Sequence, residues 1–133
     1  MKTIKQNYTI KSTLSNVWRA LVSPEYIDEW GGGSSDMSEE KGADFSLWGG
    51  SIWGTNKEVI KEKKLVQEWF SESKHRKWDQ PSIVTFELSQ VKETIHIVLI
   101  HENVPDSDAK SIEEGWDEYY LGPLKKYVEK KSI

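Results

Sequence analysis

The strongest constraint on this chain is a long amphipathic segment that runs from Ser107 or Asp108 to about Lys130. Apolar residues recur in it at spacings of three and four, which predicts a helix with one buried face. These positions are Ala109, Ile112, Trp116, Tyr119 or Tyr120, Leu124, Tyr127 and Val128. We expect this helix to lie across a sheet. Pro123 removes one backbone hydrogen bond inside the segment and predicts a kink near Tyr119.

The rest of the chain is predicted to consist of strands, with two short helices near the start. Alternation of residues 3–11 indicates a first strand, followed by a helix that Ser12 or Thr13 caps and a second helix from Pro24 to Trp30. Further strands are predicted at residues 45–47, 51–61, 65–71, 82–91 and 95–101, and a polar loop with His75, Arg76 and Trp78 at residues 74–81. Helices segregated from an antiparallel sheet define the α+β class. We expect one domain over residues 1–133.

Composition excludes several classes of protein. The chain has 36% hydrophobic and 30% charged residues, a net charge of −4 and no cysteine. Disulfides, thiolate metal sites and a cysteine nucleophile are therefore excluded, and a nucleic-acid-binding module would show a basic face instead. No apolar run approaches the roughly 20 residues that span a membrane. With no apolar stretch behind Met1–Lys5, we expect a cytoplasmic protein without membrane insertion.

Motifs along the whole chain resemble the family named for the activator of the ATPase of heat-shock protein 90. They are Val17-Trp18, Ala20-Leu21, Pro24-Glu25, Trp30, Gly42, Phe45, Leu47, Gly49-Gly50, Gly54, Glu58, Trp69, the stretch 84–88, His101, Val104-Pro105, Gly115-Trp116 and Leu124-Lys125. The resemblance implies the SRPBCC superfamily, which includes START lipid-transfer domains and the birch-pollen allergen. It also implies a helix-grip fold, in which a curved antiparallel sheet of about six or seven strands wraps around the C-terminal helix and leaves a deep apolar cavity.

The resemblance further implies that eukaryotic activators add a large N-terminal domain, for which 133 residues leave no room. The sequence departs from the family pattern at the Gly31–Gly33 run, at Trp48 before the glycine pair, and at Pro123. These three places bear on the mouth of a pocket or on the helix that covers it.

Aromatic side chains from different elements are the best candidates for a binding site, because they could converge on one cavity. The candidate ligand-binding residues are Trp18, Phe45, Trp53, Gln67, Trp69, Phe86, His101, Trp116, Tyr120 and Leu124. Gln67 and His101 would supply polar groups in an otherwise apolar pocket. The competing interpretation is that these residues fill an aromatic core. His96 and His101 fall on opposite faces of one strand, so we expect no metal site and no cofactor.

The sequence leaves three functions open. The first hypothesis is that the domain binds or sequesters a hydrophobic small molecule, such as a lipid, a polyketide or an aromatic metabolite. The second is that it contacts a heat-shock protein 90 homologue, as the family resemblance implies. The third is an enzyme of the cyclase or hydrolase type, for which His101 or Glu58 would be the acid or base, whereas Glu87 is expected to point outward. We assign no catalytic residue and expect a monomer or a weak dimer.

Overall fold

The computed structural model of the chain describes residues 1–72 and 78–131. Its centre is one antiparallel sheet of six strands in the order β1-β6-β5-β4-β3-β2. The strands are β1 (Lys2–Ile10), β2 (Asp44–Leu47), β3 (Ile52–Ile60), β4 (Lys64–Ser71), β5 (Ser82–Val91) and β6 (Thr94–Val104). The predicted α+β class and strand positions are confirmed within a residue or two, except that β6 continues three residues past the predicted end at His101.

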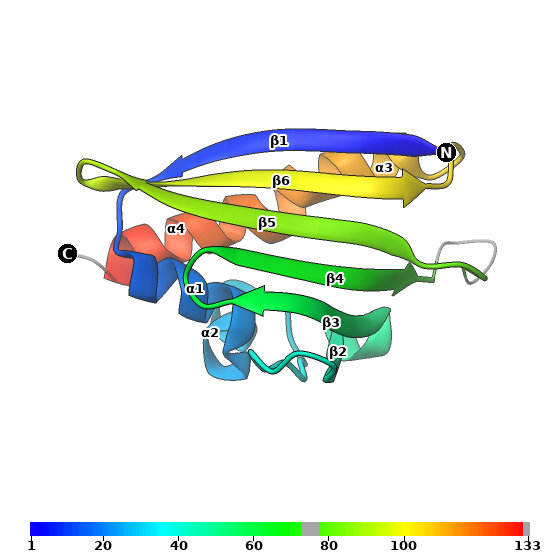
Figure 1. Cartoon of the computed structure of the whole chain (residues 1–133), viewed down its shortest axis with the longest axis horizontal. Coiled ribbons are helices and arrows are strands. Elements are labelled where there is room, and N and C mark those ends of the chain that lie inside the picture. The colour runs from blue at the N-terminus through cyan, green and yellow to red at the C-terminus, as the bar shows by residue number, and fades with distance from the viewer. Residues whose placement is uncertain (73–77, 132–133) are drawn as a thin grey trace.

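The helices lie on one face of the sheet (Figure 1). Two short helices, α1 (Leu14–Val22) and α2 (Pro24–Trp30), follow β1, and a 3-10 turn, η1 (Trp48–Gly50), joins β2 to β3. The C-terminal helix has three parts, which are α3 (Ala109–Gly115), the π turn η2 (Trp116–Tyr120) and α4 (Leu121–Lys131). A sheet closed over a long C-terminal helix in this way is the helix-grip fold that the resemblance implied. No helix in the described parts of the chain has the length and apolar character needed to cross a membrane.

The two predicted helix starts differ in how they are capped. The Thr13 hydroxyl accepts a hydrogen bond from the Asn16 backbone N–H at 3.1 Å, as expected of an N-cap threonine. Ser23 occupies the N-cap position of α2 but makes no side-chain cap hydrogen bond. α2 therefore starts without a side-chain cap at Pro24, whose fixed φ suits the first helical position.

The disturbance that Pro123 predicts takes the form of a π turn. The Leu121 backbone N–H donates to the Trp116 carbonyl, five residues back instead of four. A Cβ at Gly122 would collide with the Asp117 carbonyl oxygen, so only glycine permits this close approach. The wider turn lies just before Pro123, where an N–H would be missing from the helix ladder in any case.

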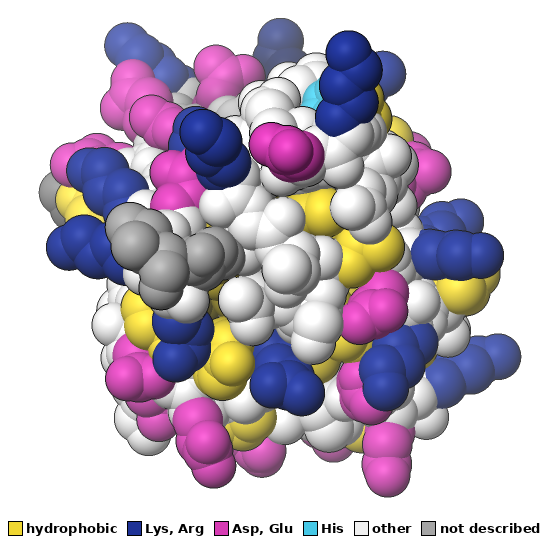
Figure 2. Space-filling model, turned by 90° about the vertical axis from the view of Figure 1, so that its left-hand side faces the viewer, with side chains coloured by type: hydrophobic (Ala, Val, Ile, Leu, Met, Phe, Trp, Pro, Cys, Tyr) yellow, Lys and Arg dark blue, Asp and Glu magenta, His cyan; other side chains and the backbone are white. Residues whose placement is uncertain are grey.

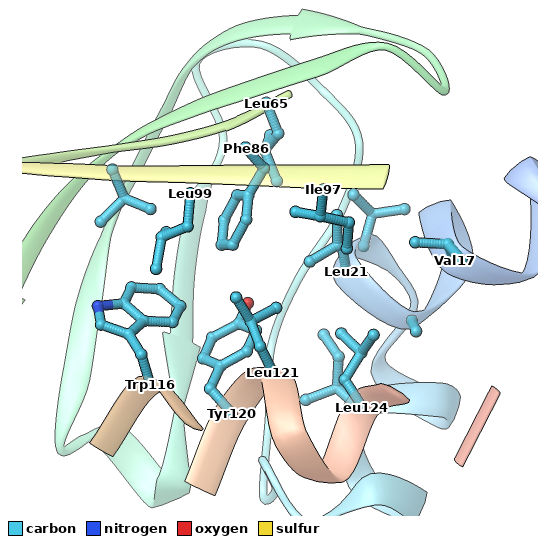
Figure 3. Packing of buried hydrophobic residues seen from close by; sticks show 14 of the residues in the cluster. Val17, Leu21, Leu65, Phe86, Ile97, Leu99, Trp116, Tyr120, Leu121 and Leu124 are labelled. Carbon is cyan, nitrogen blue, oxygen red and sulfur yellow. The ribbon is translucent and has the colours of Figure 1, made fainter. Parts of the chain in front are cut away.

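The core lies between the sheet and the C-terminal helix, and Figure 3 shows helix side chains pointing at strand side chains across it. Phe86 and Leu99 from the sheet meet Trp116 and Tyr120 from the helix, and all four are buried. The predicted alternation in β5 is confirmed, because Phe86 is buried and Glu87 is exposed.

Of the polar loop predicted at residues 74–81, the structure describes residues 78–81, and there one side chain is buried. The Trp78 side chain is 4% exposed and belongs to the core cluster, and its backbone N–H donates to the Ser71 carbonyl. Its large apolar surface outweighs the polar character of its neighbours in the sequence. His75 and Arg76 lie outside the described residues.

Candidate functional site

A pocket of about 690 Å³ opens between the α3 end of the C-terminal helix and the paired ends of β3 and β4. Aromatic rings dominate its lining, with serines and two carboxylates at the edge. The lining residues are Trp48, Ser51, Ile52, Trp69, Ser71, Glu72, Trp78, Ser107, Asp108, Ser111, Ile112, Gly115, Trp116, Tyr119 and Tyr120. A pocket of this size lined by ring faces suits a small organic molecule.

The inner wall of the pocket is a stack of rings. Trp69 on β4 stacks on Trp116 of the π turn, with ring centroids 4.9 Å apart and planes 26° from parallel. Tyr120 lies one turn further along the helix, 4.7 Å from Trp116 and 6.0 Å from Trp69. The three rings are each 2% exposed, so the middle of the grip is filled and the pocket begins where this stack ends.

Each of the four indoles in the lining uses its N–H inside the protein. Trp48 donates to the Gly31 carbonyl at 2.8 Å, and Trp69 donates to Gln67 Oε1 at 2.9 Å. Trp78 donates to Asp108 Oδ2 at 2.8 Å and Trp116 to His101 Nδ1 at 3.0 Å. These rings therefore offer their faces and carbon edges to the pocket, and not hydrogen-bond donors.

His101 sits behind this wall in a single, defined tautomer. Its Nδ1 accepts from Trp116, so the proton must be on Nε2, which lies 2.7 Å from Ser82 Oγ. The Ser82 hydroxyl in turn donates to the Trp69 carbonyl at 3.2 Å. Burial lowers the pKa of His101 to about 3, because the site has no water to solvate the charged ring. His101 therefore orients Trp116 as a neutral acceptor and has no free nitrogen for base catalysis in this arrangement.

A second buried polar chain joins Trp69 to the loop before β2. Gln67 accepts from Trp69 and its amide donates to Asn56 Oδ1 at 2.9 Å. The Asn56 amide then donates to the carbonyls of Ser38 and Glu40 at 2.9 and 3.1 Å. Gln67 and Asn56 are completely buried, and their side chains are satisfied by these contacts. Gln67 thus fixes the edge of Trp69 and does not face the pocket.

The Tyr120 hydroxyl is the exception in this satisfied core. It is buried and has no hydrogen-bond partner in the described part of the chain, and burial raises its pKa above the ordinary value. Five rings surround the Tyr120 ring at centroid distances of 4.7–6.0 Å, those of Trp30, Trp48, Trp69, Phe86 and Trp116. The phenol is held there by its ring contacts and not by its oxygen.

The structure brings five of the ten sequence-predicted site residues into one cluster: Trp69, Phe86, His101, Trp116 and Tyr120. Phe45 and Gln67 contact this cluster through Trp69, with the Phe45 ring 6.3 Å away.

The other three lie elsewhere. Trp18 on α1 donates to Glu39 Oε2 at 2.6 Å, and Leu124 packs in the core away from Trp116 (Figure 3). Trp53 stacks on Phe70 at 5.7 Å on the face of the sheet opposite the helices. Its strand register directs it outward, because its neighbour Gly54 is the inward residue.

Charged groups outside the pocket form ordinary surface pairs. Glu58 is half-buried and lies 3.6 Å from Lys64 Nζ, and Glu87 is exposed on β5. Residues 1–72 and 78–131 contain no group of three His, Cys, Asp or Glu side chains placed to hold a metal ion. Acidic and basic side chains are interspersed at the end of the molecule that carries the C-terminus, away from the pocket (Figure 2).

Of the lining residues, sequence reasoning named only Trp69, Trp116 and Tyr120, and those it missed include Trp48, Trp78 and Asp108. Trp48 was recognised only as a departure from the family pattern, although a bulky ring before a glycine pair is a signal for a special turn. It has a φ of 50°, and its backbone N–H donates to the Gly32 carbonyl, so the glycine run and Trp48 form one loop pair. The Trp78–Asp108 contact joins residues 30 apart, which no local pattern reveals.

Comparison with known proteins agrees with the fold. The sequence profile of the family described as "Activator of Hsp90 ATPase homolog 1-like protein" matches residues 11–129. A curated relative from Dictyostelium discoideum, named activator of 90 kDa heat shock protein ATPase homolog, is 24% identical over 93% of this chain and 32% of its own length. The chain spans about a third of the length of the curated relatives it matches.

Two solved structures illustrate the range of similar folds. A heat-shock protein 90 activator from Plasmodium falciparum superposes with a TM-score of 0.84 at 22% identity, over 95% of each chain. DynU16, from the dynemicin biosynthetic locus, has a TM-score of 0.81 at 17% identity, over 99% of this chain and 49% of its own. Because the family profile covers nearly the whole sequence, the chain belongs to the family of activator of Hsp90 ATPase homolog 1-like proteins.

Proposed function

We propose that this domain binds a hydrophobic, ring-containing small molecule in the pocket beside α3. The observation that carries the proposal is the lining: about 690 Å³ of space faces four indoles whose N–H groups are already bonded internally. Such walls favour apolar ring surface, whose burial contributes roughly 25 cal/mol per Å². The biosynthetic locus of DynU16 is compatible with a role toward a small molecule.

In this proposal the candidate residues have different tasks. Trp69, Trp116 and Tyr120 touch the ligand, because they line the pocket. Phe86 and His101 support these rings from the sheet side, since each contacts Trp116.

The remaining five candidates contribute to the structure around the pocket and do not touch the ligand. They are Trp18, Phe45, Trp53, Gln67 and Leu124, none of which lines the pocket.

The test uses a substitution that fills the pocket without disturbing the fold. A Cβ at Gly115 would meet only the Tyr119 ring, at 3.8 Å, and Gly115 lines the pocket with helical backbone angles. Gly115→Leu should therefore be tolerated and occupy the site, whereas Lys110→Leu, on the exposed side of α3, is the matched control.

A panel of fatty acids, sterols, flavonoids and polyketides would be titrated into the three proteins and followed by backbone amide and indole N–H shifts. The proposal expects saturable shifts around Trp69 and Trp116 in the original protein and in Lys110→Leu, and none in Gly115→Leu. Equal binding by all three proteins would place the ligand elsewhere, and no shift with any compound would reject the proposal.

A second candidate function is contact with a heat-shock protein 90 homologue, which family membership favours. Stimulated ATP hydrolysis by the purified chaperone, together with a specific complex, would support it. Gly115→Leu separates the two functions, because filling an internal pocket should abolish small-molecule binding and leave contact through the outer surface intact. A chaperone complex that is also lost in Gly115→Leu would show that the partner uses the pocket itself.

A further inference from the structure

We infer that the pocket selects ring-containing molecules that carry a positive charge, such as protonated amines. The inference rests on the proposed function and names the class of ligand. It is based on the donors, ring surfaces and charges that the lining leaves available once its internal hydrogen bonds are made.

The described lining is poor in hydrogen-bond donors. Its four indole N–H groups are all used within the protein, so the side-chain donors left are hydroxyls at the rim, such as Ser111 and Tyr119. An anionic ligand needs N–H or cationic donors, and the described lining residues include no lysine, arginine or histidine. A carboxylate or phosphate group would therefore exchange its hydration for a few neutral hydroxyl donors and no charged one.

The same lining is rich in groups that attract a cation. The indole rings of Trp69, Trp116 and Trp48 belong to the lining, and indole is the best aromatic partner for a cation. Two carboxylates also belong to the lining. Asp108, the half-buried residue before α3, uses one oxygen to accept from Trp78, and Glu72 lies at the exposed end of β4.

The geometry sets out how such a ligand would lie. Its rings would occupy the space against the Trp69–Trp116 stack, and its charged group would point toward Asp108 and Glu72 at the rim. The net charge of −4 adds a weak attraction at longer range that salt would screen. The basic sequence Lys74–Lys77 follows Glu72 and lies outside the described residues. The test therefore compares ligands that share one ring system and differ in charge.

The experiment compares three probes with one ring system: 1-naphthylmethylamine, 1-naphthylmethanol and 1-naphthylacetate. Affinities would be measured by calorimetry at pH 7 on the full chain. We expect the amine to bind about five- to thirtyfold more tightly than the alcohol, from ring-face and carboxylate attraction, and the acetate to bind more weakly than the alcohol.

Charge-removing variants locate the effect. The double variant Glu72→Gln with Asp108→Asn should clearly lower the preference for the amine, because only the attraction to the indole rings remains, while the new amide oxygen at 108 still accepts from Trp78. Glu87→Gln removes one charge from the outer sheet face and should leave the preference unchanged. Unchanged alcohol binding in the double variant would show that the pocket is intact.

The outcomes separate this inference from the proposed function. If the alcohol or the acetate binds as tightly as the amine, the selectivity for cations is wrong and the pocket still binds rings. If the preference is undiminished in the double variant, these two carboxylates do not contribute to it and the inference also fails. If none of the three probes binds, the proposed function itself is rejected.

Discussion

Acidification should destabilise this protein through His101, and the change that isolates the effect is His101→Gln. His101 is 0% exposed and neutral, with Nδ1 accepting from Trp116 and Nε2 facing Ser82. A glutamine can accept and donate in the same two directions but cannot take up a proton. The rings of Trp69, Trp78 and Trp116 surround His101, and burial is the cause of its lowered pKa.

The size of the effect follows from proton linkage. Burial lowers the pKa of His101 to about 3, below its ordinary value of 6.5, so the unfolded chain binds more protons between these two pH values. Stability is therefore complete above pH 6.5 and falls as the pH decreases toward 3. At about 1.4 kcal/mol per pH unit, the free energy of unfolding should drop by about 2 kcal/mol between pH 7 and pH 5 from this residue alone.

The assay is urea unfolding at several pH values between 7 and 5, followed by tryptophan fluorescence. The absolute stability of His101→Gln will be lower because ring contacts are lost, so the pH slopes are compared, with His96→Gln on the other face of β6 as control. The free energy of unfolding should fall by about 2 kcal/mol less between pH 7 and pH 5 in the variant than in the original protein. Identical slopes, or an NMR titration in which the His101 ring gains a proton above pH 5, would refute the assignment of a buried neutral histidine.

Three further substitutions probe the frame around the pocket, each by urea unfolding. Tyr120→Phe removes a buried hydroxyl without a partner and should raise the free energy of unfolding by about 1 kcal/mol, so a clear loss would indicate a hidden hydrogen bond. Gly122→Ala places a Cβ against the Asp117 carbonyl and should cost roughly 2 kcal/mol, whereas an unchanged midpoint would mean that the π turn relaxes freely. Asn56→Ala removes three hydrogen bonds of a buried side chain, to the Gln67 amide and to the Ser38 and Glu40 carbonyls, and should cost about 3 kcal/mol, and a neutral result would show that water replaces the side chain.

Much of the fold could be predicted because its elements have local causes. Alternation in β5 and the apolar stripe of the C-terminal helix predict the buried face of each element. Phe86 and Trp116 lie on these faces and are in the core. Pro123 gave the position of the helix irregularity but not its kind, since a π turn also depends on the close approach that Gly122 allows. The sequence also could not show that the Ser23 side chain makes no cap hydrogen bond to α2, because tertiary contacts set the rotamer of that side chain.

The site was less predictable because its residues meet over long separations. Periodicity placed Trp69 and Trp116 on inward faces, which was enough to bring them together. It could not show that Trp53 faces outward against Phe70, because an exposed ring and a buried ring look alike in a sequence. Nor could it reveal Trp78, which is buried among polar neighbours in sequence and held by Asp108 from the start of α3.

The bonded indoles explain why this core can be full and still leave a usable pocket. Trp48, Trp78 and Trp116 each hydrogen-bond a residue from a different segment of the chain, so contacts within the protein hold the pocket walls in position. A wall fixed in this way loses little conformational freedom on binding, and preorganisation of this kind is a source of affinity. The same fixation means that the pocket cannot widen without breaking one of these hydrogen bonds. A ligand of the kind proposed should therefore be rigid and of limited size, with its polar groups at the rim.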